Sequence, residues 1–162
     1  MDGLSEEQHR AFIREAVEMA TENVASGKGG PFGAIIVKDR QVIGRGVNRV
    51  TERHDPTAHA EVMAIRDACT RLGHFRLEGA DIYTSCEPCP MCLGALYWAH
   101  IRTIYYAAVN TDAARAGFDD SFIYKEIPLP HDKRAIPIHQ LECSHALRPF
   151  DTWVEMENKI EY

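Results

Sequence analysis

Two short motifs constrain this chain most, because each follows a predicted strand and opens a predicted helix. The first is His59-Ala60-Glu61, and the second is Pro88-Cys89-Pro90-Met91-Cys92. Three residues separate Cys89 from Cys92, so on a helix they lie about 60° apart and both sulfurs can reach one ion. Unpaired amide hydrogens and the dipole at a helix start favour thiolates there. With His59 as a third ligand, the fold must bring two helix starts together.

The same spacing predicts an open metal site. Glu61 is two residues from His59 and is rotated by about 200° on a helix, so it need not ligate the metal. Three protein ligands and one open position are typical of catalytic zinc, which lowers the pKa of a water in the fourth position to about 7. Glu61 can carry protons from that water to a leaving amine. His-x-Glu followed by Pro-Cys-x-x-Cys is the pattern of zinc nucleobase deaminases.

Each motif also has a plainer interpretation. A His and a Glu at a helix start are usually surface polar groups. A lone Cys-x-x-Cys pair could serve redox chemistry, or it could join Cys86 and His59 in a closed structural zinc site. The closed site leaves Glu61 without a role and requires Cys86 to turn back past Pro88 onto the same ion. The combined motifs therefore favour the open site.

Charge and composition limit the domain organisation, the classes of binding partner and the cellular location that are expected of this protein. The 162 residues suit one compact domain, residues 1–162. Eighteen basic against twenty-four acidic residues give a net charge of −6, which disfavours nucleic acid. No basic start with an apolar run is present and no apolar stretch could span a bilayer, so neither secretion nor a membrane is expected. The cytoplasm is therefore the expected location, and in such a reducing compartment clustered cysteines more often bind metal or do chemistry than form disulfides. The five cysteines are Cys69, Cys86, Cys89, Cys92 and Cys143.

The order of predicted elements indicates an α/β fold with a mixed sheet and helices on both faces. A capping box at Ser5 and Gln8 begins the first helix, which ends near Gly27. Thr57 is expected to cap the second helix, which stops at Gly73. The region from Asn110 to Asp120 is expected to be a loop. Strands are predicted at 32–37, 42–50, 80–85, 101–109 and 136–141, and further helices at 88–99, 122–125 and from 149 onward.

Several longer strings resemble the bacterial guanine deaminases of the cytidine-deaminase-like superfamily. They are GGPFGAIIVKD, HDPTAHAE, YTSCEPCPMCLGALYWA, YAAVNTDAARAGFDDSFIYKE and the terminal NKIEY. The resemblance implies a three-layer α/β/α fold with a five-stranded mixed sheet, one zinc ion per subunit and hydrolysis of guanine to xanthine and ammonia. It also implies a homodimer in which the segment 149–162 crosses to the partner subunit, as in a domain swap. Implied substrate contacts are Phe32, Asn48, Ala60, Trp98, Asp120 and Tyr162.

The chemistry of four of these residues suits a purine base. Aromatic faces would stack on it, an amide would meet its carbonyl and ring nitrogens, and Asp120 would accept from its amine. By residue type alone, Phe32 and Trp98 are more often core residues, while Asn48 and Asp120 are more often turn or capping residues. Glu126 is a weaker acidic candidate.

Alternative functions remain open at this stage. A guanosine or cytosine-type deaminase shares the motifs, and so does a tRNA adenosine deaminase, which the acidic charge disfavours. A zinc domain that only binds a partner protein is the non-enzymatic alternative.

The C-terminal residues 158–162 would by default be a disordered end. A mobile aromatic terminus could instead close over a small base and exclude water.

Overall fold

The computed structural model describes residues 3–162. They form two compact units, of which the first ends at Ser121 and the second is Phe122–Tyr162.

The first element is α1 (Glu6–Ala25), which begins with the predicted capping box. The Ser5 hydroxyl accepts from the Gln8 amide at 3.3 Å, and the Gln8 side chain accepts from the Ser5 amide at 2.9 Å. These bonds satisfy two amides that would otherwise lack partners at the helix start.

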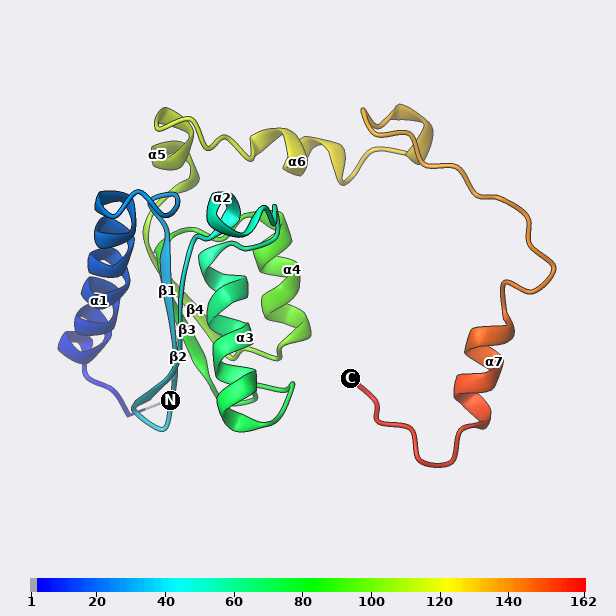
Figure 1. The fold of residues 1–162 in the computed structure, drawn as a ribbon, viewed down its shortest axis with the longest axis horizontal. Helices are drawn as coiled ribbons and strands as arrows, with labels where there is room; N and C mark the ends of the chain where they lie inside the picture. The colour runs from blue at the N-terminus through cyan, green and yellow to red at the C-terminus, as the bar shows by residue number, and fades with distance from the viewer. Residues whose placement is uncertain (1–2) are drawn as a thin grey trace. The chain divides into compact units, whose positions relative to one another are not determined.

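Four strands form the sheet of the first unit (Figure 1). They are β1 (Gly33–Lys38), β2 (Gln41–Val47), β3 (Asp81–Cys86) and β4 (Thr103–Ala108), and their order in the sheet is β2-β1-β3-β4. β1 is antiparallel to both of its neighbours, whereas β3 and β4 are parallel. A parallel pair needs a crossover connection, and α4 (Pro90–Trp98) provides it. The sheet is therefore mixed, as predicted.

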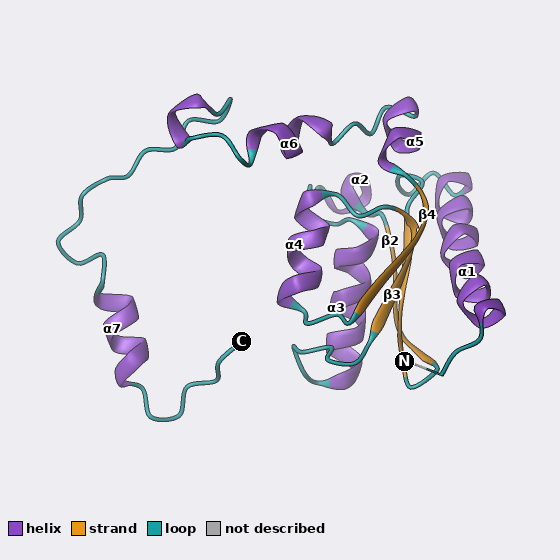
Figure 2. Cartoon of the chain, turned by 180° about the vertical axis from the view of Figure 1, so that it is seen from behind, coloured by secondary structure: helices purple, strands orange, loops and turns teal. Residues whose placement is uncertain are grey.

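Helices cover both faces of this sheet (Figure 2). α1 packs on one face, where Ile35, Val37 and Tyr83 are buried. α3 (Ala60–Leu72) and α4 pack on the other face, where Ala34 and Ile36 are buried. Successive residues of β1 thus point to opposite cores, as strand geometry requires. The three-layer α/β/α arrangement is confirmed.

The close approach of α3 to β2 depends on glycine. A β-carbon at Gly46 would overlap the Ala60 carbonyl oxygen and the Ala64 amide nitrogen. The contact lies at the start of α3, directly after His59. Gly46 therefore sets how close the first turn of α3 lies to the sheet.

We expect Gly46→Ala to destabilise the fold by about 1–3 kcal/mol, the usual cost of overpacking, because backbone must move. Thermal unfolding followed by circular dichroism would show the lower midpoint. Gly94→Ala is the matched control, since Gly94 is exposed inside α4 and a β-carbon there meets nothing within 4 Å. The control should be neutral or slightly stabilising. An unchanged midpoint for Gly46→Ala would contradict the packing argument.

Two predicted features of the first unit differ from the structure. α3 begins at Ala60 with His59 as its N-cap, so Thr57 is not the cap. Thr57 instead donates its hydroxyl and its amide to the Asp55 carboxylate, at 2.6 and 2.8 Å. The predicted loop after Asn110 contains a short helix, α5 (Asn110–Arg115), whose first turn is capped by Asp112. A helix of six residues is too short to show a helical spacing of apolar residues in the sequence, so it was not predicted.

The predicted strand at 136–141 is wrong, and the described sheet has four strands where five were expected. A strand exists only when its backbone pairs with a neighbour, and Pro137, the second residue of this segment, has no amide hydrogen to donate. The remaining elements are α2 (Val50–Arg53), α6 (Ser121–Glu126), the short 3-10 helix His131–Lys133 and α7 (Arg148–Glu155). Between residues 3 and 162, no helix is long and apolar enough to cross a membrane.

Candidate metal centre and active site

The ends of two helices position the three predicted metal ligands. His59 is the N-cap residue of α3, and Cys89 is the N-cap residue of α4. Both have extended backbones, and neither side chain caps its own helix. Pro90 occupies the first turn of α4, where a missing amide hydrogen costs nothing. Cys92 follows one turn after Cys89 and is fully buried.

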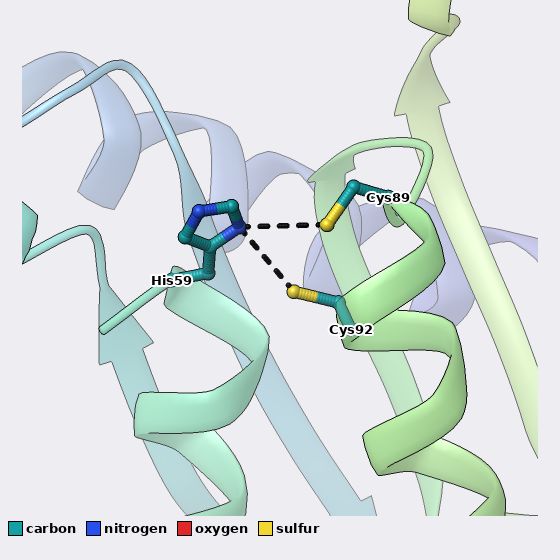
Figure 3. Close-up of side chains that lie close together, drawn as sticks. All are labelled: His59, Cys89 and Cys92. Carbon is teal, nitrogen blue, oxygen red and sulfur yellow. Dashed lines mark hydrogen bonds between the residues drawn. The ribbon is translucent and has the colours of Figure 1, made fainter. Parts of the chain in front are cut away.

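The three side chains converge on one point (Figure 3). The His59 Nδ1 atom lies 3.6 Å from the Cys89 sulfur and 3.5 Å from the Cys92 sulfur. Tetrahedral zinc with bonds of about 2.3 Å to sulfur and 2.0–2.1 Å to nitrogen would separate such ligand atoms by roughly 3.5 Å. The three ligand atoms all lie within 4.8 Å of one another. The geometry therefore fits zinc.

The electrostatics of the group also suit a divalent cation. A hydrogen bond from Cys92, followed by one from His59, lowers the pKa of the Cys89 thiol to about 4. The same hydrogen bond, together with burial, raises the pKa of Cys92. The hydrogen bond to Cys89 raises the pKa of His59. The lowered pKa of Cys89 favours its thiolate form, and sulfur with imidazole nitrogen is a donor set that zinc prefers.

Glu61 lies beside this group, in the first turn of α3, and only 7% of its surface is exposed. Burial is the largest cause that raises the pKa of its carboxyl, and the charge of Cys89 adds to it. A hydrogen bond with Cys92 lowers that pKa in part. The carboxyl is outside the His59, Cys89 and Cys92 group, yet it interacts with both sulfurs. The predicted open metal site expects its proton carrier at a position of this kind.

Cys86 does not belong to the ligand group. Its sulfur contacts the Val109 carbonyl oxygen at 3.9 Å, and burial raises the pKa of its thiol to about 11. Among residues 3–162, the only cluster that could hold a metal is His59, Cys89 and Cys92. Cys69 and Cys143 are free thiols. The closed structural zinc site thus lacks its fourth ligand.

Three of the predicted substrate contacts lie at the ends of elements in the first unit: Ala60 begins α3, Phe32 directly precedes β1 and Asn48 directly follows β2. Ala60 is the buried first residue of α3. Phe32 packs edge-on against Phe118, with ring centroids 5.0 Å apart. Asn48 is 6% exposed, and its side-chain oxygen accepts hydrogen bonds from backbone amides. These residues have the chemistry that a base pocket requires.

Asp120 is half-buried and lies close enough to Cys89 to be influenced by its charge. Burial raises the pKa of the Asp120 carboxyl, and the Cys89 thiolate raises it further. A carboxylate near the metal group can accept a hydrogen bond from a substrate amine. The contact of Asp120 with substrate stays a prediction.

The remaining candidates are Trp98, Tyr162 and Glu126. Trp98 is the exposed last residue of α4, so the rise of the helix places it roughly 13 Å along the axis from Cys89. Tyr162 is exposed and belongs to the second unit. Glu126, also in the second unit, accepts a hydrogen bond from the Ala135 amide at 2.6 Å. A role for Trp98 and Tyr162 in the pocket stays a prediction, and Glu126 has a structural partner.

Comparison with known sequences identifies the family. The cytidine and deoxycytidylate deaminase zinc-binding region matches residues 6–108, which include the metal group and Glu61. The chain belongs to this deaminase family. Guanine deaminase from Bacillus subtilis is 56% identical over 95% of this deaminase and 99% of the relative. A tRNA-specific adenosine deaminase from Agrobacterium fabrum is 53% identical over 48% of this deaminase and 51% of its own length.

Solved structures agree with these matches. The crystal structure of Bacillus subtilis guanine deaminase has a TM-score of 0.93, at 56% identity, and the match covers 95% of this deaminase and 98% of that chain. A structure of guanine deaminase from Nitrosomonas europaea has a TM-score of 0.64 at 33% identity, covering 68% of this deaminase and 64% of that chain. The cytidine-deaminase-like fold and its zinc cofactor are therefore established for this deaminase.

Two residues near the site were missed from the sequence. Phe118 packs edge-on against Phe32, but a phenylalanine in a predicted loop carries no pattern that assigns it. Asn23 is buried in α1 and bonds to the backbone of Asn48. Its signal was present, because Asn23 follows Ala16 and Ala20 on the buried stripe of the helix. A polar residue on such a stripe needs a buried partner.

Proposed function

We propose that this deaminase hydrolyses guanine to xanthine and ammonia. The observation that carries the proposal is the 56% identity to Bacillus subtilis guanine deaminase over 154 residues. A match of that length in a chain of 162 residues must extend far beyond the zinc-binding region at 6–108. The likeness therefore includes the part of the chain that the metal motifs do not explain.

His59, Cys89 and Cys92 would hold the zinc, one ion per subunit. Bound zinc would supply a water molecule with a pKa near 7. In the reaction, a bond forms between the water oxygen and C2 of guanine, and the bond from C2 to the exocyclic amine breaks. Glu61 would take one proton from the water and pass it to the ring nitrogen. It would then take the second proton from the new hydroxyl on C2 and deliver it to the leaving amine, so that the C2 carbonyl forms and ammonia departs. Its burial keeps this exchange away from bulk water.

Recognition of guanine needs one aromatic face, one donor and one acceptor. Phe32 would stack against the base, and the Asn48 side-chain amide would donate to the carbonyl oxygen at C6. The Asp120 carboxylate would accept from the amine at C2, which becomes the leaving group. The Ala60 backbone lies at the helix start between the metal ligand and Glu61. Together these groups distinguish a base with a C6 carbonyl and a C2 amine.

Replacing Asp120 by asparagine should lower kcat/KM for guanine by about tenfold, because an amide can present a donor where the amine needs an acceptor. Zinc content should stay at one equivalent. Steady-state kinetics and metal analysis measure both quantities. Asp119→Asn is the matched control, since its carboxylate accepts from the Ser121 amide. An Asp120 variant with unchanged kinetics would remove the residue from the site.

Ammonia release from a panel of substrates tests the assignment itself. Guanine, guanosine, cytosine, cytidine, adenine and tRNA should be offered to the purified protein under one condition. Guanine should react fastest. Faster release from guanosine or tRNA would favour the alternative nucleoside or tRNA deaminase. A protein that binds zinc but releases no ammonia from any of the six would favour a non-enzymatic zinc domain.

The proposed assembly is a homodimer with a single domain per chain, residues 1–162, and with the segment 149–162 exchanged between subunits. Two exposed apolar regions support an interface, since large exposed apolar patches commonly mark contact surfaces. One is the end of α4, with Tyr97 and Trp98. The other surrounds α7, with Leu147, Phe150 and Val154. Sedimentation of the purified protein would give the oligomeric state.

Removal of residues 158–162 should lower kcat/KM for guanine by about tenfold, if Tyr162 closes over the base and excludes water. Zinc content and thermal unfolding should stay close to those of the full chain. Unchanged kinetics would return this segment to an ordinary chain end. Loss of zinc or of the fold would show that it is part of the core structure.

The cytoplasm is the proposed location. All five cysteines are free thiols in the structure, which suits a reducing compartment. Two of them must also remain reduced to bind zinc. Fractionation of the source cells, with the protein detected by antibody, would test the location.

A further inference from the structure

Asn23 forms a buried polar junction near the end of α1. Only 4% of the surface of this residue is exposed. The Nδ2 atom donates to the Gly30 carbonyl at 2.9 Å and to the Asn48 carbonyl at 3.0 Å. The Oδ1 atom accepts from the Arg49 guanidinium at 3.0 Å. One side chain thus ties α1 to the loop before β1 and to the segment after β2.

The orientation of this amide is fixed by its partners. Two carbonyl oxygens require donors, and a guanidinium requires an acceptor, so only one of the two amide orientations satisfies all three. The packing is also tight, because a β-carbon at Gly29 would overlap the Asn48 carbonyl oxygen and lie 2.9 Å from the Asn23 Nδ2 atom. The Asn48 backbone therefore has little freedom to move.

The side chain of Asn48 is oriented by the same segment. Its Oδ1 atom accepts from the Gly30 amide at 3.2 Å and from the Val50 amide at 3.3 Å. Both lone pairs of the oxygen are used, and within residues 3–162 the Nδ2 atom makes no hydrogen bond. The amide can therefore present only a donor to a substrate. A donor matches the C6 carbonyl of guanine.

The junction also connects to the metal group. The Arg49 amide donates to the Ala58 carbonyl at 2.9 Å, one residue before the ligand His59. The segment that carries Asn48 is therefore hydrogen-bonded to Asn23 on one side and to the loop that leads into α3 on the other. Movement of this segment would shift the Asn48 amide relative to the zinc ligands.

We propose that Asn23 is a positioning residue for substrate selection, which holds the Asn48 amide as a hydrogen-bond donor to the C6 carbonyl of the purine. The inference rests on the proposed guanine activity. Asn23 touches no substrate and acts through Asn48. Its loss should weaken the recognition of the C6 carbonyl specifically, rather than the binding of purines in general.

Asn23→Asp tests this with a side chain of the same shape. A carboxylate oxygen would face the Gly30 and Asn48 carbonyls and repel them. We expect KM for guanine to rise about five- to tenfold, the range of one hydrogen bond, with kcat changed less. The inhibition constant of 2-aminopurine, which lacks an oxygen at C6, should change by less than about twofold. Ser26→Ala is the matched control, since it removes a hydrogen bond to the Asn23 backbone only.

Three further measurements make the result decisive. Wild-type turnover of guanine is measured first, and its absence would overturn the proposed function itself. Asn23→Ser replaces Asn23→Asp if the latter does not fold. In an Asn48→Ala background, either substitution should add nothing to the loss of guanine selectivity. Equal weakening of guanine and 2-aminopurine, or additive losses in the double variant, would show a merely structural role and overturn the inference.

Discussion

Replacing Cys92 by alanine should release the zinc and abolish guanine deamination. Cys92 is fully buried and is one of the three residues that form the metal group, so its loss leaves only two of the three protein ligands. Loss of the ion removes several kcal/mol of charge stabilisation, and each 1.36 kcal/mol is tenfold in rate, so turnover should fall by at least ~10³-fold. Metal analysis should find far less than one zinc per chain.

Cys86→Ser is the matched control for this result. Cys86 is also buried and lies at the end of β3, three residues before Cys89, but its sulfur faces the Val109 carbonyl. The control should keep its full zinc content. If Cys86→Ser lost the zinc while Glu61→Gln kept wild-type activity, the site would be structural and closed.

Glu61→Gln should keep the zinc and lose the chemistry. The amide has the size of the carboxyl but cannot take up or deliver a proton, so turnover should fall by at least ~10²-fold, the low end for a positioned acid or base. KM should change much less than kcat, because the substitution removes proton transfer rather than a binding surface. Metal analysis and steady-state kinetics on one preparation give both quantities.

Glu22→Gln, on the exposed side of α1, controls for a general effect of removing a carboxylate. It should leave turnover and zinc unchanged. Wild-type turnover in Glu61→Gln would refute the proposed mechanism, whatever the metal content. Loss of zinc in that variant would instead mean that Glu61 supports the ligands.

The sequence predicted the elements that are set by local rules. Alternating or helical apolar spacing gave α1, the β1–β2 hairpin, β3, α4 and β4 to within a few residues. The metal group was predictable because Cys89 and Cys92 lie one helical turn apart, whatever surrounds them. His59 needed one further assumption, that the starts of two helices meet, and the structure confirms it.

The remaining features depend on partners that are distant in the sequence. Residues 136–141 have apolar content suited to a strand, but pairing decides whether a strand forms, and Pro137 opposes it. Asn23 and Asn48 are 25 residues apart and meet only when α1 and β2 are both in place. Trp98 and Tyr162 were assigned by resemblance, because no spacing or periodicity in the sequence marks either of them as a substrate contact.

Because His59 and Cys89 are both N-cap residues, zinc binding is linked to the local opening of two helices. An N-cap side chain usually accepts from an amide in its own first turn, and here neither does so. Coordination of the ion by these two residues would therefore stabilise the first turns of both helices. Chelation should speed hydrogen exchange at the first-turn amides of α3 and α4 together, while the middle of β3 keeps its protection. One small cation would then set the local opening free energy of two separate segments at once.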